Sequence, residues 1–331
     1  MSYLTGHSAV AAASPDGACT SRKLGGMWRN LRRSDRGRAA LAGEASAADA
    51  RSRRRDTGDD GPFVPLPAGS PVDAERTGAP IAFFDVDNTL MRGASIYHFA
   101  RGLAARDLFT TRDLLRFAWG QALFRVSGTE QPQQINAARD AALAFVAGHG
   151  VDDLVDLCEG IYDDTMSDRI WEGARRLVER HLMAGERVWL VTATPVELAD
   201  IIKRRLGLDG ALGTVAETVD GVYTGRLVGD LLHGPAKAAA VEALAAREGV
   251  DLAHCTAYSD SSNDLPLLHS VGRPNAVNPD DALRAHALAN GWPLHEFRTH
   301  RTALRVGIPA AAAGAVAGGL AVGVLRRRTR R

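Results

Sequence analysis

A short apolar run followed by two aspartates occupies residues 81–90, which read Ile81-Ala82-Phe83-Phe84-Asp85-Val86-Asp87-Asn88-Thr89-Leu90. An apolar run of this length, bounded by polar residues, indicates a buried strand. Open α/β sheets bind their ligands at the carboxyl ends of the strands, where Asp85 would emerge. Because alternate residues of an extended segment point the same way, Asp85 and Asp87 can face one site. Two carboxylates that lie close together are costly unless a cation or a proton lies between them.

A second apolar run ends in hydroxyl groups. Residues 187–191 form this run and are followed by Thr192-Ala193-Thr194-Pro195. Pro195 suits the first position of a helix, which the pattern continues through Leu206. A hydroxyl and the free backbone N–H groups at a helix N-terminus form an anion-binding site. Thr192 and the backbone of Ala193 are therefore candidates to hold an anion.

A third short run supplies a second pair of acids, and a helix supplies a lysine. The run Cys255-Thr256-Ala257-Tyr258 is followed by Ser259-Asp260-Ser261-Ser262-Asn263-Asp264-Leu265. Lys237 comes directly after Gly234-Pro235, a helix-start signal. Each residue alone has an ordinary explanation as a helix cap, a surface charge or a turn residue. Their common order along three strand ends and one helix is difficult to obtain by chance.

This order resembles that of the haloacid dehalogenase superfamily of phosphatases, and most closely its phosphoserine-phosphatase-like branch. The matching motifs are DxDxT at Asp85, an apolar strand ending in Thr192, then Lys237, then (G/S)DxxxD from Ser259 to Asp264. The resemblance covers residues 79–297. It implies an α/β fold in which a Rossmann-like parallel sheet forms the core and an all-helical cap domain is inserted after the first strand.

Two departures from the family pattern concern the substrate. Ser259 stands where the family usually has glycine. Phosphoserine phosphatases also have an acidic residue shortly after the DxDxT loop that reads the amine of the substrate, whereas residues 91–98 contain no acid here. The resemblance therefore implies phosphatase chemistry, but phosphoserine as the substrate does not follow from it.

The resemblance implies catalytic roles for the first acids. Asp85 would attack phosphorus and form an aspartyl-phosphate intermediate. Asp87 would protonate the leaving oxygen and then activate the attacking water. The expected cofactor is Mg²⁺, held by the Asp85 carboxylate, the Asp87 backbone carbonyl and Asp260, because this ion prefers oxygen ligands and retains several waters.

The remaining candidates would hold the phosphoryl group or support the residues that do. Thr192, Ala193 and Lys237 are expected to bind the phosphoryl oxygens as charge redistributes during transfer. Asp264 is expected to orient Lys237 or a metal-bound water. Asn263 has either a packing role or a role in the site.

The predicted function is hydrolysis of a small phosphorylated metabolite, phosphoserine-like compounds included. Alternatives are a phosphotransferase with the same intermediate, a phosphatase of a lipid-linked phosphate, and a phosphate-binding regulatory module without activity. The last could also be a receiver-type phosphoacceptor, and Asp87 argues against both forms, because a phosphoacceptor has no need of a positioned acid and base for a leaving group. Arg92, Ser95, Tyr97 and His98 follow the loop closely and are further candidates to face the substrate.

Composition favours an ordinary intracellular enzyme. With 331 residues, of which 45% are hydrophobic and 24% charged, the chain can bury one or two cores. Its formal net charge of +1 gives no general affinity for nucleic acid. Three widely spaced cysteines without a CxxC motif fit a reducing compartment, so the predicted location is the cytoplasm.

The chain divides into five predicted segments. Residues 1–78 are rich in Ala, Gly, Ser and Arg and are expected to be disordered. Residues 79–92 and 182–297 would form the catalytic core, and residues 93–181 the helical cap. Within the core, Asp220-Gly221 between Thr- and Val-rich arms predicts a β-hairpin. Residues 304–325 are a candidate membrane-associated helix, followed by a basic tail at 326–331.

Two alternatives are open for the C-terminal segment. Residues 306–325 carry no charge, and at about 1.5 Å per residue they would span roughly the 30 Å of a bilayer's hydrocarbon. The segment is only weakly apolar, however, and a spanning helix would place the basic tail on the side opposite to a cytoplasmic enzyme, against the usual charge rule. A helix bound to the surface of an anionic membrane is the competing interpretation.

Overall fold

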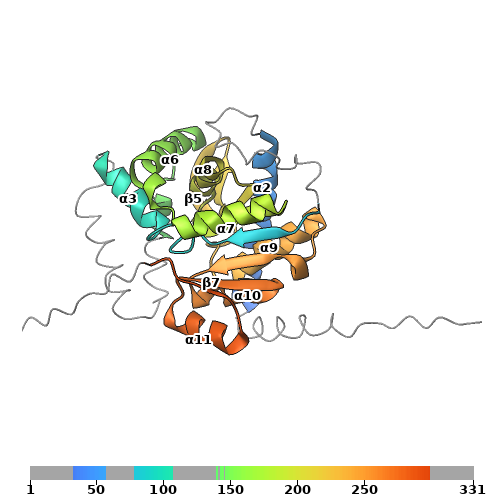
Figure 1. The fold of residues 1–331 in the computed structure, drawn as a ribbon. Helices are drawn as coiled ribbons and strands as arrows, with labels where there is room; N and C mark the ends of the chain where they lie inside the picture. Colours follow the sequence, from blue (N-terminus) through green and yellow to red (C-terminus); the bar gives the residue numbers. More distant parts are fainter. Residues whose placement is uncertain (1–32, 57–77, 107–138, 141, 145, 299–331) are drawn as a thin grey trace, which may run out of the picture. The chain divides into compact units, whose positions relative to one another are not determined.

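The computed structural model describes residues 33–56, 78–106, 139–140, 142–144 and 146–298 (Figure 1). In chain order its elements are α2 (Arg33–Asp56), β1 (Ile81–Phe84), α3 (Ser95–Ala105), α6 (Val151–Thr165), η2 (Ser167–Arg169), α7 (Glu172–Met183), β2 (Arg187–Pro195), α8 (Val196–Leu206), β3 (Gly210–Thr214), β4 (Ala216–Val219), β5 (Val222–Leu227), α9 (Pro235–Glu248), η3 (Leu252–His254), β6 (Thr256–Ser259), η4 (Ser262–Asp264), α10 (Leu265–Ser270), β7 (Arg273–Val277), α11 (Asp281–Asn290) and β8 (Leu294–His295).

A six-stranded parallel sheet lies at the centre of this part of the chain. Its strand order is β3-β2-β1-β6-β7-β8, and every neighbouring pair is parallel. The chain builds outward from β1 in one direction through β2 and β3, and in the other through β6, β7 and β8. Ligands of such sheets bind where the strand order reverses, so the carboxyl end of β1 is the expected position of the site.

Side chains of β1 alternate between two hydrophobic cores, one on each face of the sheet. Ala82 and Phe84 belong to a core that includes residues of α3, α6, α7 and α8. Ile81 and Phe83 belong to a second core with residues of α2, α9, α10 and α11. All four β1 side chains are fully buried. A strand covered on both faces explains the continuous apolar run in its sequence, and the predicted α/β class with a parallel sheet is confirmed.

The predicted hairpin is also present. β4 and β5 pair in antiparallel fashion, and the turn residues Asp220 and Gly221 have φ angles of 51° and 76°. Positive φ at both central positions is typical of a tight two-residue hairpin turn. The hairpin contacts the insertion, because the Val151 amide donates to the Gly221 carbonyl at 2.9 Å.

The prediction of disorder was wrong for residues 33–56, which form helix α2. This helix lies along α9 (Figure 1) and buries Ala42, Ala47 and Ala50 against it. A Cβ at Gly43 would approach the Ala240 amide nitrogen to 2.6 Å, so the two helices touch through small side chains. Small residues carry little apolar signal, which explains why the composition indicated disorder instead.

The insertion after β1 leaves and re-enters the core at neighbouring points. The Arg92 amide donates to the Arg169 carbonyl at 2.8 Å, and the Trp171 amide donates to the Leu90 carbonyl at 2.9 Å. Helices α3 and α6 lie between these two crossings. The predicted boundary at residue 181 does not match this packing, because α7 contacts β2 and buries Leu177 and Val178, which precede that boundary, in the core with Phe84.

Several predicted segments lie outside the described residues. These are the remainder of the N-terminal segment at 1–32 and 57–77, the part of the insertion at 107–138, and the apolar and basic C-terminal segments at 304–325 and 326–331. A complete helical cap therefore stays a prediction. Within the part of the chain that the structure describes, none of the helices has the length and apolar character needed to cross a membrane.

Candidate active site

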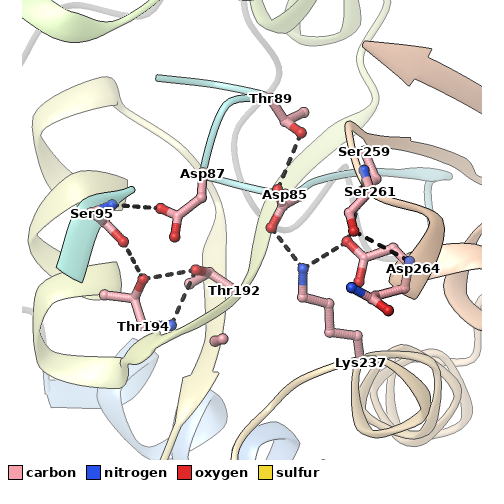
Figure 2. Close-up of polar contacts among 12 residues, drawn as sticks. Asp85, Asp87, Thr89, Ser95, Thr192, Thr194, Lys237, Ser259, Ser261 and Asp264 are labelled. Carbon is pink, nitrogen blue, oxygen red and sulfur yellow. Dashed lines mark hydrogen bonds and ion pairs between the residues drawn. The ribbon is translucent and has the colours of Figure 1, made fainter. Parts of the chain in front are cut away.

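Asp85 follows directly after β1, at the point where the strand order reverses. Its amide donates to the Tyr258 carbonyl of β6 at 3.0 Å, which continues the sheet by one residue. Its buried carboxylate has two partners (Figure 2): Lys237 Nζ lies 2.7 Å from Oδ1, and Thr89 Oγ1 donates to Oδ2 at 3.1 Å. Thr89 belongs to the DxDxT motif and Lys237 is the predicted lysine, so the structure brings these two motifs together.

Lys237 links the first and last acidic motifs. It lies in the first turn of α9, where Pro235 starts the helix after Gly234 at φ 54°. Its Nζ also donates to Asp264 Oδ2 at 2.7 Å. Burial alone would lower the pKa of Lys237, but the negative charges of Asp264 and Asp85 outweigh it and raise this pKa above its usual value. Lys237 therefore stays cationic in the site.

Asp264 is held by a hydroxyl as well as by Lys237. Ser259 Oγ donates to Asp264 Oδ2 at 2.7 Å, and the same hydroxyl accepts from the Ser261 amide at 3.2 Å. The residue that departs from the family's glycine thus supplies an extra hydrogen bond to Asp264, five residues further along the chain. The Asn263 amide donates to Ser261 Oγ at 3.2 Å and belongs to the turn, so a site role for the Asn263 side chain stays a prediction.

Two carboxyls of this group have strongly raised pKa values. Burial raises the pKa of Asp85 to about 7; Lys237 opposes this shift, and Asp264 and Asp87 add to it. Burial likewise raises the pKa of Asp260 to about 8, and the charges of Asp85 and Asp264 add to the effect. Four carboxyl groups lie near one lysine here, so ionisation of all four would leave an unbalanced negative charge that a bound cation would neutralise.

The donor set suits a hard divalent cation with few protein ligands. Among the residues that the structure describes, no group of three Asp, Glu, His or Cys side chains converges as a metal site. The predicted set needs only two carboxylates, from Asp85 and Asp260, and one carbonyl, from Asp87. Mg²⁺ commonly binds proteins through one or two carboxylates and keeps several waters, so the residues present fit this ion.

On the other side of Asp85, Asp87 lies beside three hydroxyl side chains (Figure 2). The Ser95 amide donates to Asp87 Oδ1 at 2.7 Å, and Ser95 Oγ lies 2.6 Å from Thr194 Oγ1. Thr194 Oγ1 in turn lies 2.9 Å from Thr192 Oγ1 (Figure 2). Burial raises the pKa of Asp87, with the hydrogen bond from Ser95 opposing the shift. A raised pKa favours a carboxyl that must hold a proton near neutral pH.

The turn that carries Asp87 is stabilised by residues that the sequence did not single out. Asn88 has φ 56°, and its Oδ1 accepts from the Gly93 amide at 3.2 Å. Asn278, which follows β7, donates through Nδ2 to the Asn88 carbonyl at 3.0 Å. Asparagine tolerates positive φ better than most residues. Asn88, next to the second aspartate, could therefore have been predicted from the sequence as a turn residue. Nothing in the sequence connects the distant Asn278 with this turn.

The other candidate residues differ in their burial and in their contacts. Ala193 follows Thr192, and its carbonyl accepts from Thr214 Oγ1 at 2.7 Å; phosphate binding by its amide stays a prediction. His98 is buried, with Nε2 3.0 Å from the Arg92 carbonyl. Arg92 is exposed, donates to the Asp168 carbonyl and lies over the Trp171 ring at 5.6 Å. Tyr97 is exposed on α3.

Comparison with known proteins identifies the family. The sequence model of the haloacid dehalogenase-like hydrolase family matches residues 82–269. The chain belongs to this family. Every motif described above, from Asp85 to Asp264, lies within the matched residues. The match confirms that the chain is a hydrolase of the superfamily that its motifs resembled.

Individual relatives cover most of the chain. A protein of Mycobacterium leprae named as a hydrolase is 53% identical over 291 residues, which are 88% of this chain and 94% of the relative. Phosphoserine phosphatase SerB1 of Mycobacterium tuberculosis is 56% identical over 250 residues, or 75% of this chain and 81% of the relative. The second relative is named as a phosphatase, which is the class of enzyme that the sequence predicted.

One solved structure extends the comparison to the fold. A protein of unknown function from Bordetella pertussis Tohama I has a TM-score of 0.59 and 30% sequence identity. The match covers 67% of this chain and all of that chain. This chain and the Bordetella protein therefore share the arrangement of the parallel sheet and its helices.

Proposed function

We propose that this chain is a Mg²⁺-dependent phosphomonoester hydrolase that works through an aspartyl-phosphate intermediate on Asp85. The observation that carries the proposal is the position of the Asp85 carboxylate at the end of β1, bonded to Lys237 Nζ at 2.7 Å and to the Thr89 hydroxyl at 3.1 Å. A buried carboxylate held by two donors has a fixed orientation. Such fixed positioning is what an in-line attack on phosphorus requires.

The chemistry divides between the two aspartates. Asp85 forms a bond to phosphorus while the bond to the leaving oxygen breaks, and Asp87 gives its proton to that oxygen. Asp87 then takes a proton from water as the water attacks the aspartyl-phosphate, which releases inorganic phosphate and regenerates the Asp85 carboxylate. The raised pKa of Asp87 supports the first step, because the group holds its proton nearer neutral pH.

Lys237 and Thr192 stabilise the phosphoryl oxygens. Lys237 keeps its charge in a buried setting where electrostatic interactions are stronger than in water. The Asp85 and Asp260 carboxylates and the Asp87 carbonyl would hold Mg²⁺, which supplies positive charge against the repulsion between an anionic substrate and an anionic nucleophile. Asp264 orients Lys237 through its 2.7 Å contact.

The proposed substrate class is a small phosphate monoester. One relative is named phosphoserine phosphatase, which makes phosphoserine the first compound to test. The segment 91–98 offers no acid for a substrate amine, so other phosphorylated metabolites belong in the same panel. We propose a cytoplasmic location from the unpaired cysteines, Cys158 and Cys255; the proposal of membrane association depends on residues 304–325 alone.

A panel of phosphate esters tests the function. Phosphate release is measured from para-nitrophenyl phosphate, phosphoserine, sugar phosphates, nucleotides and lysophosphatidic acid, with Mg²⁺ and with EDTA. We expect Mg²⁺-dependent release that falls by about four orders of magnitude or more in Asp85→Asn, since the attacking charge is lost. Asp220→Asn is the matched control, because the same substitution at an exposed hairpin turn keeps a residue that tolerates positive φ.

The same panel distinguishes a phosphotransferase from a hydrolase. Transfer of phosphate to an added alcohol in place of water would reveal a phosphotransferase with the same intermediate. Full activity of Asp85→Asn, or full activity of metal-free enzyme in EDTA, would contradict the proposed mechanism. Absence of release from every ester, with wild type folded and Mg²⁺ present, would favour a phosphate-binding module.

A further inference from the structure

We infer that Thr194 and Ser95 are positioning residues that fix the hydroxyl proton of Thr192 toward the phosphoryl group. The inference deepens the proposed function and rests on it. Thr192 and Thr194 alternate at the end of β2 and therefore face the same side. Ser95 begins α3, the first helix of the insertion. The three side chains come from two parts of the chain that are about a hundred residues apart and meet beside Asp85.

The three hydroxyls form one short chain of hydrogen bonds. Ser95 Oγ and Thr194 Oγ1 are 2.6 Å apart, and Thr194 Oγ1 and Thr192 Oγ1 are 2.9 Å apart. The Thr194 amide also donates to Thr192 Oγ1 at 3.2 Å. The exposed fractions of Ser95, Thr192 and Thr194 are 0%, 1% and 3%. Water therefore has little access to this chain, and its protons are arranged by the protein.

A count of donors and acceptors shows what the chain must do if Thr192 is to donate to a phosphoryl group. Each hydroxyl has one proton and two acceptor positions. Thr192 Oγ1 accepts from the Thr194 amide, and it accepts a second time if the Thr194 hydroxyl donates to it. Its own proton is then free for an external acceptor. This arrangement requires Thr194 to accept from Ser95 in turn, so the protons run from Ser95 to Thr194 to Thr192.

An anionic phosphoryl group selects this direction. If the protons ran the other way, Thr192 would donate to Thr194 and present only lone pairs to an anion. The Ser95 hydroxyl contacts both Thr194 and the Asp87 carboxyl, while the Ser95 backbone amide donates separately to Asp87. Chains of hydrogen bonds with one direction strengthen each member. Ser95 thus connects the predicted acid to the predicted phosphate-binding hydroxyl.

A double-mutant cycle tests the inference with para-nitrophenyl phosphate as substrate and inorganic phosphate as a competitive inhibitor. Thr194→Val removes the hydroxyl with little change in shape, and we expect kcat/KM to fall about tenfold and phosphate to inhibit about tenfold more weakly. In a Thr192→Val background the same change should cost less than about twofold, because the donor it orients is already absent. Thr194→Ser should restore most of the activity.

Thr256→Val is the matched control. Thr256 is a buried threonine of the same sheet whose Oγ1 has no hydrogen-bond partner among the described residues, so its loss should leave kcat/KM and phosphate inhibition unchanged. Additive losses in the cycle, or a Thr194→Ser variant as poor as Thr194→Val, would overturn the inference while wild type remains an Asp85-dependent phosphatase. A wild type without Asp85-dependent phosphate release would instead overturn the proposed function, and the inference with it.

Discussion

Asp85 lies between two unlike groups of side chains. On one side Lys237 bridges Asp85 and Asp264 through two contacts of 2.7 Å, and Asp260 completes a set of charges that do not balance. On the other side Ser95, Thr194 and Thr192 form an uncharged chain of hydrogen bonds. The charged side depends on pH and on a cation, whereas the hydroxyl side depends on the direction of its protons. The two sides therefore respond to different experiments.

The largest expected effect comes from removing the only cation of the charged side among the described residues. Lys237→Met keeps much of the side-chain volume but leaves Asp85 and Asp264 buried without their partner. We expect kcat/KM to fall by about three orders of magnitude or more, and the free energy of unfolding to fall by about 3–5 kcal/mol in metal-free protein. Phosphate release and thermal unfolding measure the two effects.

Lys203→Met is the matched control for this prediction. Lys203 is also a buried lysine with a carboxylate partner, Asp200 Oδ1 at 2.7 Å, but it lies on α8 outside the motifs. We expect this variant to lose some stability and to keep its kcat/KM. Near-wild-type catalysis by Lys237→Met would mean that the charged side does not act on the phosphoryl group.

The next effect separates the acid from the hydroxyl chain that adjoins it. Asp87→Asn cannot protonate a leaving oxygen, so we expect hydrolysis of alkyl phosphates to slow by about 10²–10⁴-fold. The loss on para-nitrophenyl phosphate should be much smaller, since its leaving group needs little protonation. Thr194→Val should slow both substrates equally, because it acts on the phosphoryl oxygens. Rates of release from both esters give the comparison, and equal losses in Asp87→Asn would remove this residue from the acid role.

The two groups of side chains differed in how well the sequence predicted them, because only the charged group consists of motif residues. The acids of the charged side belong to sequence motifs that follow strand ends: Asp85 follows β1, and Asp260 and Asp264 follow β6. Parallel strands bring such residues to one edge of a sheet without further information. Their distances to Lys237 could not be predicted, but their convergence could.

The hydroxyl side was predicted only in part. Thr192 was identified by its motif, and Ser95 only as a residue near the substrate. Thr194 received no role of its own, since threonine before a helix has many structural explanations. The contact between Ser95 and Thr194 joins residues 99 positions apart, and it depends on the pairing of β1 with β2 and on the turn that returns Ser95 to Asp87. Helix α2 escaped prediction for a related reason, because its buried alanines give no periodic apolar pattern.

The smallest expected effect concerns the pH dependence of stability in metal-free protein. The pKa of Asp260 is about 8 in the folded state and the ordinary value is 3.8, so the folded protein binds more protons than the unfolded chain over the range between them. Stability is then highest below the ordinary pKa and is lost as pH rises through about 8. Asp85, with a pKa of about 7, has the same sign. Lys237, whose raised pKa lies far above this range, contributes no slope there.

Thermal unfolding between pH 7 and 8.5 tests this sign. The buried histidines, such as His98 and His181, have lowered pKa values and give the opposite slope only at lower pH, around their ordinary value of 6.5. We expect metal-free wild type to lose a few degrees of Tm across the range and Asp260→Asn to lose less, because it has no charge to develop. Mg²⁺ should raise the Tm of wild type more at pH 8.5 than at pH 7, since binding favours the ionised carboxyls. A metal-free wild type whose Tm is as flat as that of Asp260→Asn would show that the pKa of Asp260 is not raised in the folded protein.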